Sequence, residues 1–150
     1  MVQLCRVAKN PEPYELLLAL LRVQSSLQWR GEAFFQPFGL TPSKFNILNL
    51  LSINHGRIDQ AKLVEQFLVG KSSVLNRMIR DNLVQREAHP KDKRQTALVV
   101  TDKGTKLWRS SAPMYETKVK AVFGVIPPSH RRQFLQDLDK LHQAFAKALL

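Results

Sequence analysis

The stretch that decides the fold runs from Leu83 to Gly104 and reads LVQREAHPKDKRQTALVVTDKG. Its first part, Leu83 to Ala88, is typical of a short strand, and a second, β-branched strand is predicted from Thr96 to Val100. The turn between them, Pro90 to Gln95, is basic, and the pair Thr101-Asp102 after the second strand is a helix-start signal. The pattern therefore predicts a β-hairpin with a cationic tip, placed between helices.

The tip of this hairpin carries the charges expected of a surface that touches a polyanion. Lys91, Lys93 and Arg94 surround a single acid, Asp92. A hairpin tip is narrow enough to enter a DNA minor groove, where an arginine gains from the concentrated negative potential, so we expect Arg94 to do so. Asp92 is expected to accept a hydrogen bond from Arg94 or from turn amides and so fix the tip. The alternative is an ordinary solvated turn.

The composition agrees with a nucleic-acid partner. The chain has 150 residues, enough for one domain with its own core, and a formal net charge of +11. A strongly basic protein is suited to double-stranded DNA, because backbone charge dominates such affinities. The alternative is a basic protein that its charge merely keeps in solution.

Several other classes are not expected. The longest apolar stretch, Leu16 to Leu21, is far below the ~20 residues of a membrane span, and no signal peptide precedes it. A single cysteine, Cys5, excludes an internal disulfide and a cysteine-based zinc site, which fits a cytoplasmic protein. No phosphate loop, nucleophile elbow or paired carboxylates are present, so neither enzyme chemistry nor a cofactor is expected. The histidines lack metal-ligand spacing: His55, His89, His130 and His142.

Four helix starts are expected before the hairpin, and the first three are as follows. An Asn10-Pro11 cap opens a first helix that Pro37 and Gly39 end. Thr41-Pro42 opens a second helix, which breaks at residues 54–56, and Asp59 opens a third. A one-residue strand is predicted at Ile58. The second helix places its apolar side chains on one face: Phe45, Leu48 and Leu51, flanked by Ile47 and Leu50.

Two short helices, residues 59–68 and 71–82, are joined by Val69-Gly70, which is the signal of a helix-turn-helix. The second of them begins Lys71-Ser72-Ser73, whose amides and hydroxyls suit phosphate contact, and Val74, Met78 and Ile79 are expected to face inward. Asparagine and arginine suit base edges in the major groove. The residues predicted to read bases are Asn76, Arg77 and Arg80. An ordinary solvated helix face is the alternative.

The two ends of the chain are expected to be long apolar helices that the middle unit does not need. A helix from Asp102 toward Ile126 contains Pro113, where a kink is expected. Pro127-Pro128 breaks the chain, with Ser129 as a cap for the last helix. The apolar face of that helix holds Phe134, Leu138, Leu141 and Phe145. One domain is therefore predicted, with a winged helix-turn-helix at 41–101 and helices at 10–37 and 103–150 that dimerise with a second copy.

These motifs resemble the MarR family of bacterial winged-helix regulators over nearly the whole chain. The motifs that carry the resemblance are Leu40-Thr41-Pro42 with Phe45 and Leu48, Gly70-Lys71-Ser72-Ser73-Val74, Leu83-Val84-Gln85-Arg86, Asp92-Lys93-Arg94, and Thr101-Asp102-Lys103-Gly104. The resemblance implies a mainly helical homodimer with a β-hairpin wing that binds pseudopalindromic double-stranded DNA and usually represses. It also implies a cleft for a small effector between the dimer helices and the DNA-binding unit. An aromatic effector near Trp29 and Phe35 is the resulting expectation, although both aromatics also suit core or dimer packing.

One departure from the family pattern affects the base-reading helix. From Lys71 to Leu83 the chain is about three residues shorter than that pattern, nearly one helical turn. Asn76 and Arg77 are then expected to face differently from their counterparts. This feature favours the competing hypothesis, a winged-helix module that binds proteins and no longer reads DNA sequence. The seven cations between Lys71 and Arg94, against three acids, favour DNA.

Overall fold

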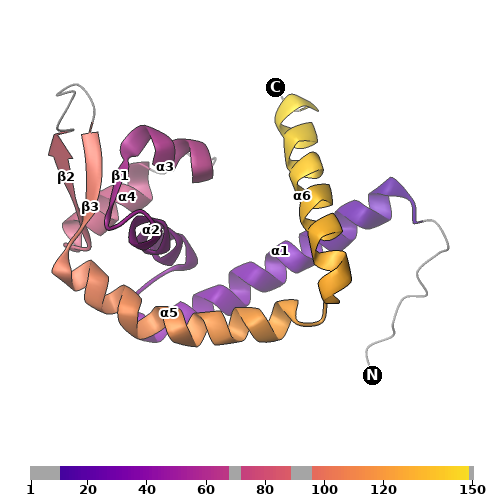
Figure 1. Ribbon diagram of the computed structural model, residues 1–150, viewed down its shortest axis with the longest axis horizontal. Helices are drawn as coiled ribbons and strands as arrows, with labels where there is room; N and C mark the ends of the chain where they lie inside the picture. Colours follow the sequence, from indigo (N-terminus) through magenta and orange to yellow (C-terminus); the bar gives the residue numbers. More distant parts are fainter. Residues whose placement is uncertain (1–10, 68–71, 89–95, 149–150) are drawn as a thin grey trace. The chain divides into compact units, whose positions relative to one another are not determined.

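The computed structural model describes residues 11–67, 72–88 and 96–148 as a mainly helical chain with one small antiparallel sheet (Figure 1). By its internal contacts the chain divides into two units, residues 1–112 and 113–150. In chain order the elements are α1 (Pro13–Phe35), the 3-10 helix η1 (Gln36–Phe38), α2 (Pro42–Ile53), β1 (Arg57–Asp59), α3 (Gln60–Phe67), α4 (Ser72–Arg80), β2 (Val84–Ala88), β3 (Thr96–Val100), α5 (Asp102–Phe123) and α6 (Pro128–Ala148).

Helix α1 begins two residues later than the sequence predicted. Asn10 lies outside the described residues, but Pro11 precedes the helix, and the cap is Glu12. The backbone N–H of Glu12 donates to Oε2 of Glu15 at 3.0 Å, and Pro13 takes the first helical position. The predicted start at Pro11 is therefore wrong. Pro11 and Pro13 are both compatible with the first helical position, and only the capping contact of Glu12 selects Pro13. Helix α1 ends at Phe35, two residues before the predicted Pro37, and Gly39, with φ 65°, ends the 3-10 turn that follows.

Helix α2 has the predicted start and end. Oγ1 of Thr41 accepts the backbone N–H of Lys44 at 3.2 Å, and Pro42 is the first helical residue. After Ile53 the chain turns through His55 and Gly56, both with positive φ. Local signals of capping and turn formation were sufficient for this element.

The sheet has the order β1-β3-β2 and is antiparallel throughout. Ile58 pairs with Leu98 on one side, and Arg86 pairs with Leu98 on the other. The hairpin strands agree closely with those predicted, whereas β1 has three residues instead of the single one expected. The hairpin is thus anchored as two strands of a three-stranded sheet.

The core lies where α1, α2, α4 and the sheet meet. The Phe35 ring is fully buried and stacks on Phe45 with ring centroids 4.5 Å apart. Met78 is fully buried, as predicted, but its buried neighbour is Leu75 rather than Val74 or Ile79, which are half-buried. Other buried side chains in this core are Ile47, Leu48, Leu51, Leu83, Val84 and Leu98.

The start of α5 packs closely against the base of the hairpin. Oγ1 of Thr101 accepts the backbone N–H of Gly104 at 3.1 Å, which confirms the predicted cap. A Cβ atom on Gly104 would lie 2.2 Å from the carbonyl oxygen of Leu83. Only glycine permits this approach of helix and strand.

In the second unit, residues 113–150, α5 ends at Phe123 rather than near Ile126, and α6 begins at Pro128. Ser129 is therefore inside the first turn, and its predicted role as the cap is wrong. Proline is favoured at the first helical position because it needs no amide partner there. Many apolar side chains of this unit are exposed within the single chain, among them Phe123, Val125, Phe134, Leu135, Leu141 and Phe145.

Candidate nucleic-acid interface

Helix α4 presents one polar face to solvent. Its buried side, Leu75 and Met78, is directed into the core, and the helix packs against α2 and β2. Positions separated by three, four and seven residues share a helix face. Four of the predicted DNA-binding residues have this spacing, and all four are exposed: Ser73, Asn76, Arg77 and Arg80.

Asn76 is tied to the neighbouring strand. Nη2 of Arg86 donates a hydrogen bond to Oδ1 of Asn76 at 3.1 Å. Alternate residues of a strand share a face, so Arg86 lies on the same face of β2 as the buried Val84, which is the face toward α4. This contact was not predictable from the sequence, because it joins residues of two elements whose relative placement only the fold defines.

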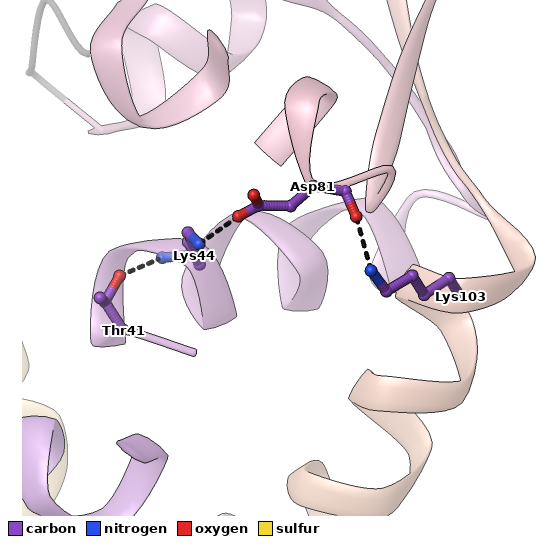
Figure 2. A network of polar contacts seen from close by, with 4 residues as sticks. All are labelled: Thr41, Lys44, Asp81 and Lys103. Carbon is purple, nitrogen blue, oxygen red and sulfur yellow. Dashed lines mark hydrogen bonds and ion pairs between the residues drawn. The ribbon is translucent and has the colours of Figure 1, made fainter. Parts of the chain in front are cut away.

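The carboxyl end of α4 is held through Asp81 (Figure 2). Nζ of Lys44 on α2 donates to the Asp81 carboxylate at 2.6 Å, and Nζ of Lys103 on α5 donates to the Asp81 carbonyl oxygen at 2.8 Å. The hydrogen bond and the charge of Lys44, with smaller contributions from Lys103 and Arg80, lower the pKa of the Asp81 carboxyl below its ordinary value. Asp81 thus connects α2 and α5 to the carboxyl end of α4.

The turn after α4 is fixed by backbone bonds. Asn82 has φ 56°, and the N–H of Leu83 donates to the carbonyl of Met78 at 2.9 Å. This geometry is typical of a helix end with one left-handed residue. Oγ1 of Thr101 donates to the Asn82 carbonyl at 2.7 Å, so the start of α5 is also bonded to this turn.

The base of the wing is crossed by an ion pair. Nη1 of Arg57 on β1 lies 2.7 Å from Oε2 of Glu87 on β2, and Nε2 of Gln85 donates to Oε1 of Glu87 at 3.0 Å. These contacts lie on the sheet face opposite to Arg86. The sequence did not suggest a role for Arg57, because its partner is thirty residues away.

The remaining predicted DNA contacts fall outside the described part of the chain. They are Lys71 before α4 and the wing-tip residues Lys91, Asp92, Lys93 and Arg94, together with the side chain of Ser72. The predicted turn at Val69-Gly70 lies outside it as well. These predictions therefore stand on the sequence alone.

The described residues form no helix that could span a membrane and no cluster of metal ligands. None of their helices combines the length and the hydropathy needed to cross a membrane. They contain no cluster of three or more His, Cys, Asp or Glu side chains that could hold a metal ion.

Comparison with known proteins identifies the family of this chain. A model described as MarR family matches residues 38–95, from the end of η1 to the wing. AbsC, a MarR family transcriptional regulator from Streptomyces coelicolor, has a crystal structure that superposes with a TM-score of 0.73 and 30% identity, covering 95% of this chain and 98% of AbsC. The chain belongs to the MarR family. It is therefore a transcriptional regulator and not an enzyme, and the mainly helical winged-helix fold predicted from the sequence is confirmed.

Two further transcriptional regulators extend the comparison. The HTH-type transcriptional repressor YetL of Bacillus subtilis (strain 168) is 27% identical over 133 residues, covering 86% of this chain and 80% of YetL. The M. tuberculosis transcriptional regulator MOSR, solved in complex with DNA, shares 22% identity and a TM-score of 0.72, covering 89% of this chain and 98% of that one. At this level of identity, the likeness to MOSR shows a shared fold.

Proposed function

We propose that this MarR-family protein is a homodimeric repressor that binds a pseudopalindromic operator in double-stranded DNA. The observation that carries the proposal is the exposed polar stripe of α4, formed by Ser73, Asn76, Arg77 and Arg80. A helix that buries one side and presents amide and guanidinium groups on the other is suited to the major groove. Repression is supported by the similarity to the repressor YetL, and DNA as partner by the fold shared with DNA-bound MOSR.

The wing supplies the second contact in this proposal. Lys91, Lys93 and Arg94 approach the DNA backbone and minor groove, and Asp92 steadies the tip. The base that would carry them is rigid, because the strands pair in full register and Arg57 bridges to Glu87. At the other end of α4, Lys71 and Ser72 contact phosphate.

The homodimer is supported by apolar side chains that the single chain leaves exposed. On α1, Leu16, Leu21 and Leu27 are each about half exposed, and Trp29 is 79% exposed. On α6, Phe134, Leu141 and Phe145 are each more than 40% exposed. Extensive apolar surface of this kind is normally covered by a partner, and a second copy that contributes the same helices is the simplest one. Deleting residues 129–150 should therefore cause aggregation or unfolding, and a folded, soluble monomer would contradict the dimer.

Release from DNA by a small aromatic acid completes the proposal. The sequence places the site near Trp29 and Phe35; the Trp29 side chain is 79% exposed, whereas the Phe35 ring is fully buried against Phe45. A shallow hollow lined by Lys103, Lys106, Leu107 and Ser110 is a second candidate place, which offers two cations and an apolar contact. Benzoate binding can be followed through tryptophan fluorescence, because Trp108 follows Leu107 on α5, where its Nε1 donates to Oδ1 of Asn49 at 3.1 Å.

Selection of bound sequences from a pool of random duplexes tests the DNA-binding proposal. A two-fold symmetric consensus, with affinity that falls steeply as salt increases, is the expected result. Salt-dependent binding without any consensus would favour a protein that uses DNA charge alone. Absence of binding to any duplex at low salt would overturn the proposal and favour the protein-interaction module.

A further inference from the structure

The hydrogen bond between Arg86 and Asn76 joins two rigid elements at the polar face of α4. The helix is anchored by the buried Leu75 and Met78, and the strand by the buried Val84. Both side chains of the bond are exposed, but their backbones are fixed by these core residues. The bond therefore restrains a side chain of the DNA-facing stripe from outside its own helix.

The chemistry of the two groups sets the direction of this restraint. A guanidinium has only donors, so the atom of the Asn76 amide that faces Arg86 must be the oxygen Oδ1. The amide nitrogen then points away from the strand. A bond to a charged donor is stronger than a neutral one, and it gains further strength when DNA displaces water from the surface.

We propose that Arg86 is a positioning residue that turns Asn76 into a hydrogen-bond donor toward DNA. This inference rests on α4 being the base-reading helix. The bidentate pairing of asparagine with adenine needs the amide oxygen and nitrogen to point at the same base edge. With Oδ1 turned to Arg86, Nδ2 is left to meet acceptors, which guanine offers at N7 and O6 and adenine only at N7. The wild-type protein should accept guanine at least as well as adenine at this base pair.

Four variants test the proposal by selection from random duplexes. Asn76→Ala identifies the base pair that Asn76 reads, because preference is lost there. Arg86→Met removes the donor while keeping the length of the side chain, and it should shift this one base pair toward adenine by about tenfold. Arg80→Met is the matched control: it removes another cation from the same helix face, and any base preference that it changes should lie at a base pair other than the one that Asn76 reads. Arg86→Leu also removes the donor, and it should shift the preference in the same direction if the Met variant does not fold.

The outcomes separate this inference from the proposed function. An unchanged preference in both Arg86 variants, or a strong wild-type preference for adenine at this pair, would overturn the positioning role while leaving DNA binding intact. A wild-type consensus that Asn76→Ala leaves unchanged would show that Asn76 reads no base, and so overturn the inference but not the operator. A double variant Asn76→Ala/Arg86→Met that matches Asn76→Ala alone would support the coupling of the two residues.

Discussion

Replacing Gly104 with alanine should destabilise the protein although it improves the intrinsic propensity of a helix. The added Cβ would lie 2.2 Å from the carbonyl oxygen of Leu83, 2.9 Å from Cγ2 of Val100 and 3.2 Å from Cδ2 of Leu48. The Leu83 oxygen accepts the N–H of Thr101 at 3.1 Å, so it cannot retreat without weakening the cap of α5. The backbone of α5 must move instead.

The expected change in the free energy of unfolding is the sum of one favourable and two unfavourable contributions. Alanine in place of glycine favours the helix by about 1 kcal/mol. Overpacking of a tight site costs about 1–3 kcal/mol, and loss of the bond from Thr101 costs about 0.5–1.5 kcal/mol. We therefore expect Gly104→Ala to lower the free energy of unfolding by roughly 0.5–3.5 kcal/mol.

Urea unfolding followed by circular dichroism, at one fixed protein concentration, measures this change. Gly31→Ala is the matched control, because a Cβ there meets only the side chain of Pro42, at 3.0 Å, and no backbone atom. Gly31→Ala should be close to neutral, since a small side-chain shift is offset by the gain in helix propensity. Equal stability of the two alanine variants, or a Gly104→Ala variant as stable as wild type, would refute the steric argument.

Three further predictions concern capping, pH and the wing. Thr41→Ala should lower the free energy of unfolding by about 1 kcal/mol through loss of the α2 cap, whereas Thr41→Ser should not, as urea unfolding can show. Lys44→Met should destabilise the protein at neutral pH. In the folded protein the pKa of the Asp81 carboxyl lies below its ordinary 3.8, so the stabilisation from its ion pair with Lys44 is present above pH 3.8 and is lost as the pH falls through the lowered pKa. The stability difference between Lys44→Met and wild type should therefore narrow in that acid range. A difference that does not change with pH would contradict this prediction. Arg94→Ala should weaken operator binding by about 1–3 kcal/mol and more than Arg77→Ala does, in titrations at fixed salt; the reverse order would show that the shortened helix dominates.

Local signals predicted most of the architecture. The cap at Thr41-Pro42 and the strands on both sides of the basic turn follow from residue preferences that act over a few positions. The same locality explains the errors, because two prolines within three residues allowed two starts for α1, and Pro127-Pro128 allowed two starts for α6. Only the capping contact or the rest of the fold selects between such alternatives.

The candidate site was predicted in part. Exposure of Asn76 and its neighbours follows from helical spacing, because the apolar residues of α4 define the opposite side. The partners of these residues were not predictable, since Arg86 lies ten residues from Asn76 and Lys44 lies thirty-seven from Asp81. Such pairs depend on strand register and helix packing, which residue preferences alone do not fix.

In the proposed function, the shortness of α4 makes these non-local contacts important for reading DNA. The helix has nine residues, about two and a half turns, and an isolated helix of this length is marginal in water. Its rigidity must come from its neighbours: Arg86 of β2 along its length, and Lys44 of α2 and Lys103 of α5 at its carboxyl end. In the proposed complex, a short helix held from three elements has fewer residues in the groove, but each is placed more firmly. Base preference should therefore depend as much on these supporting residues as on the residues that touch the bases, and substitutions outside the groove should change the operator that is selected.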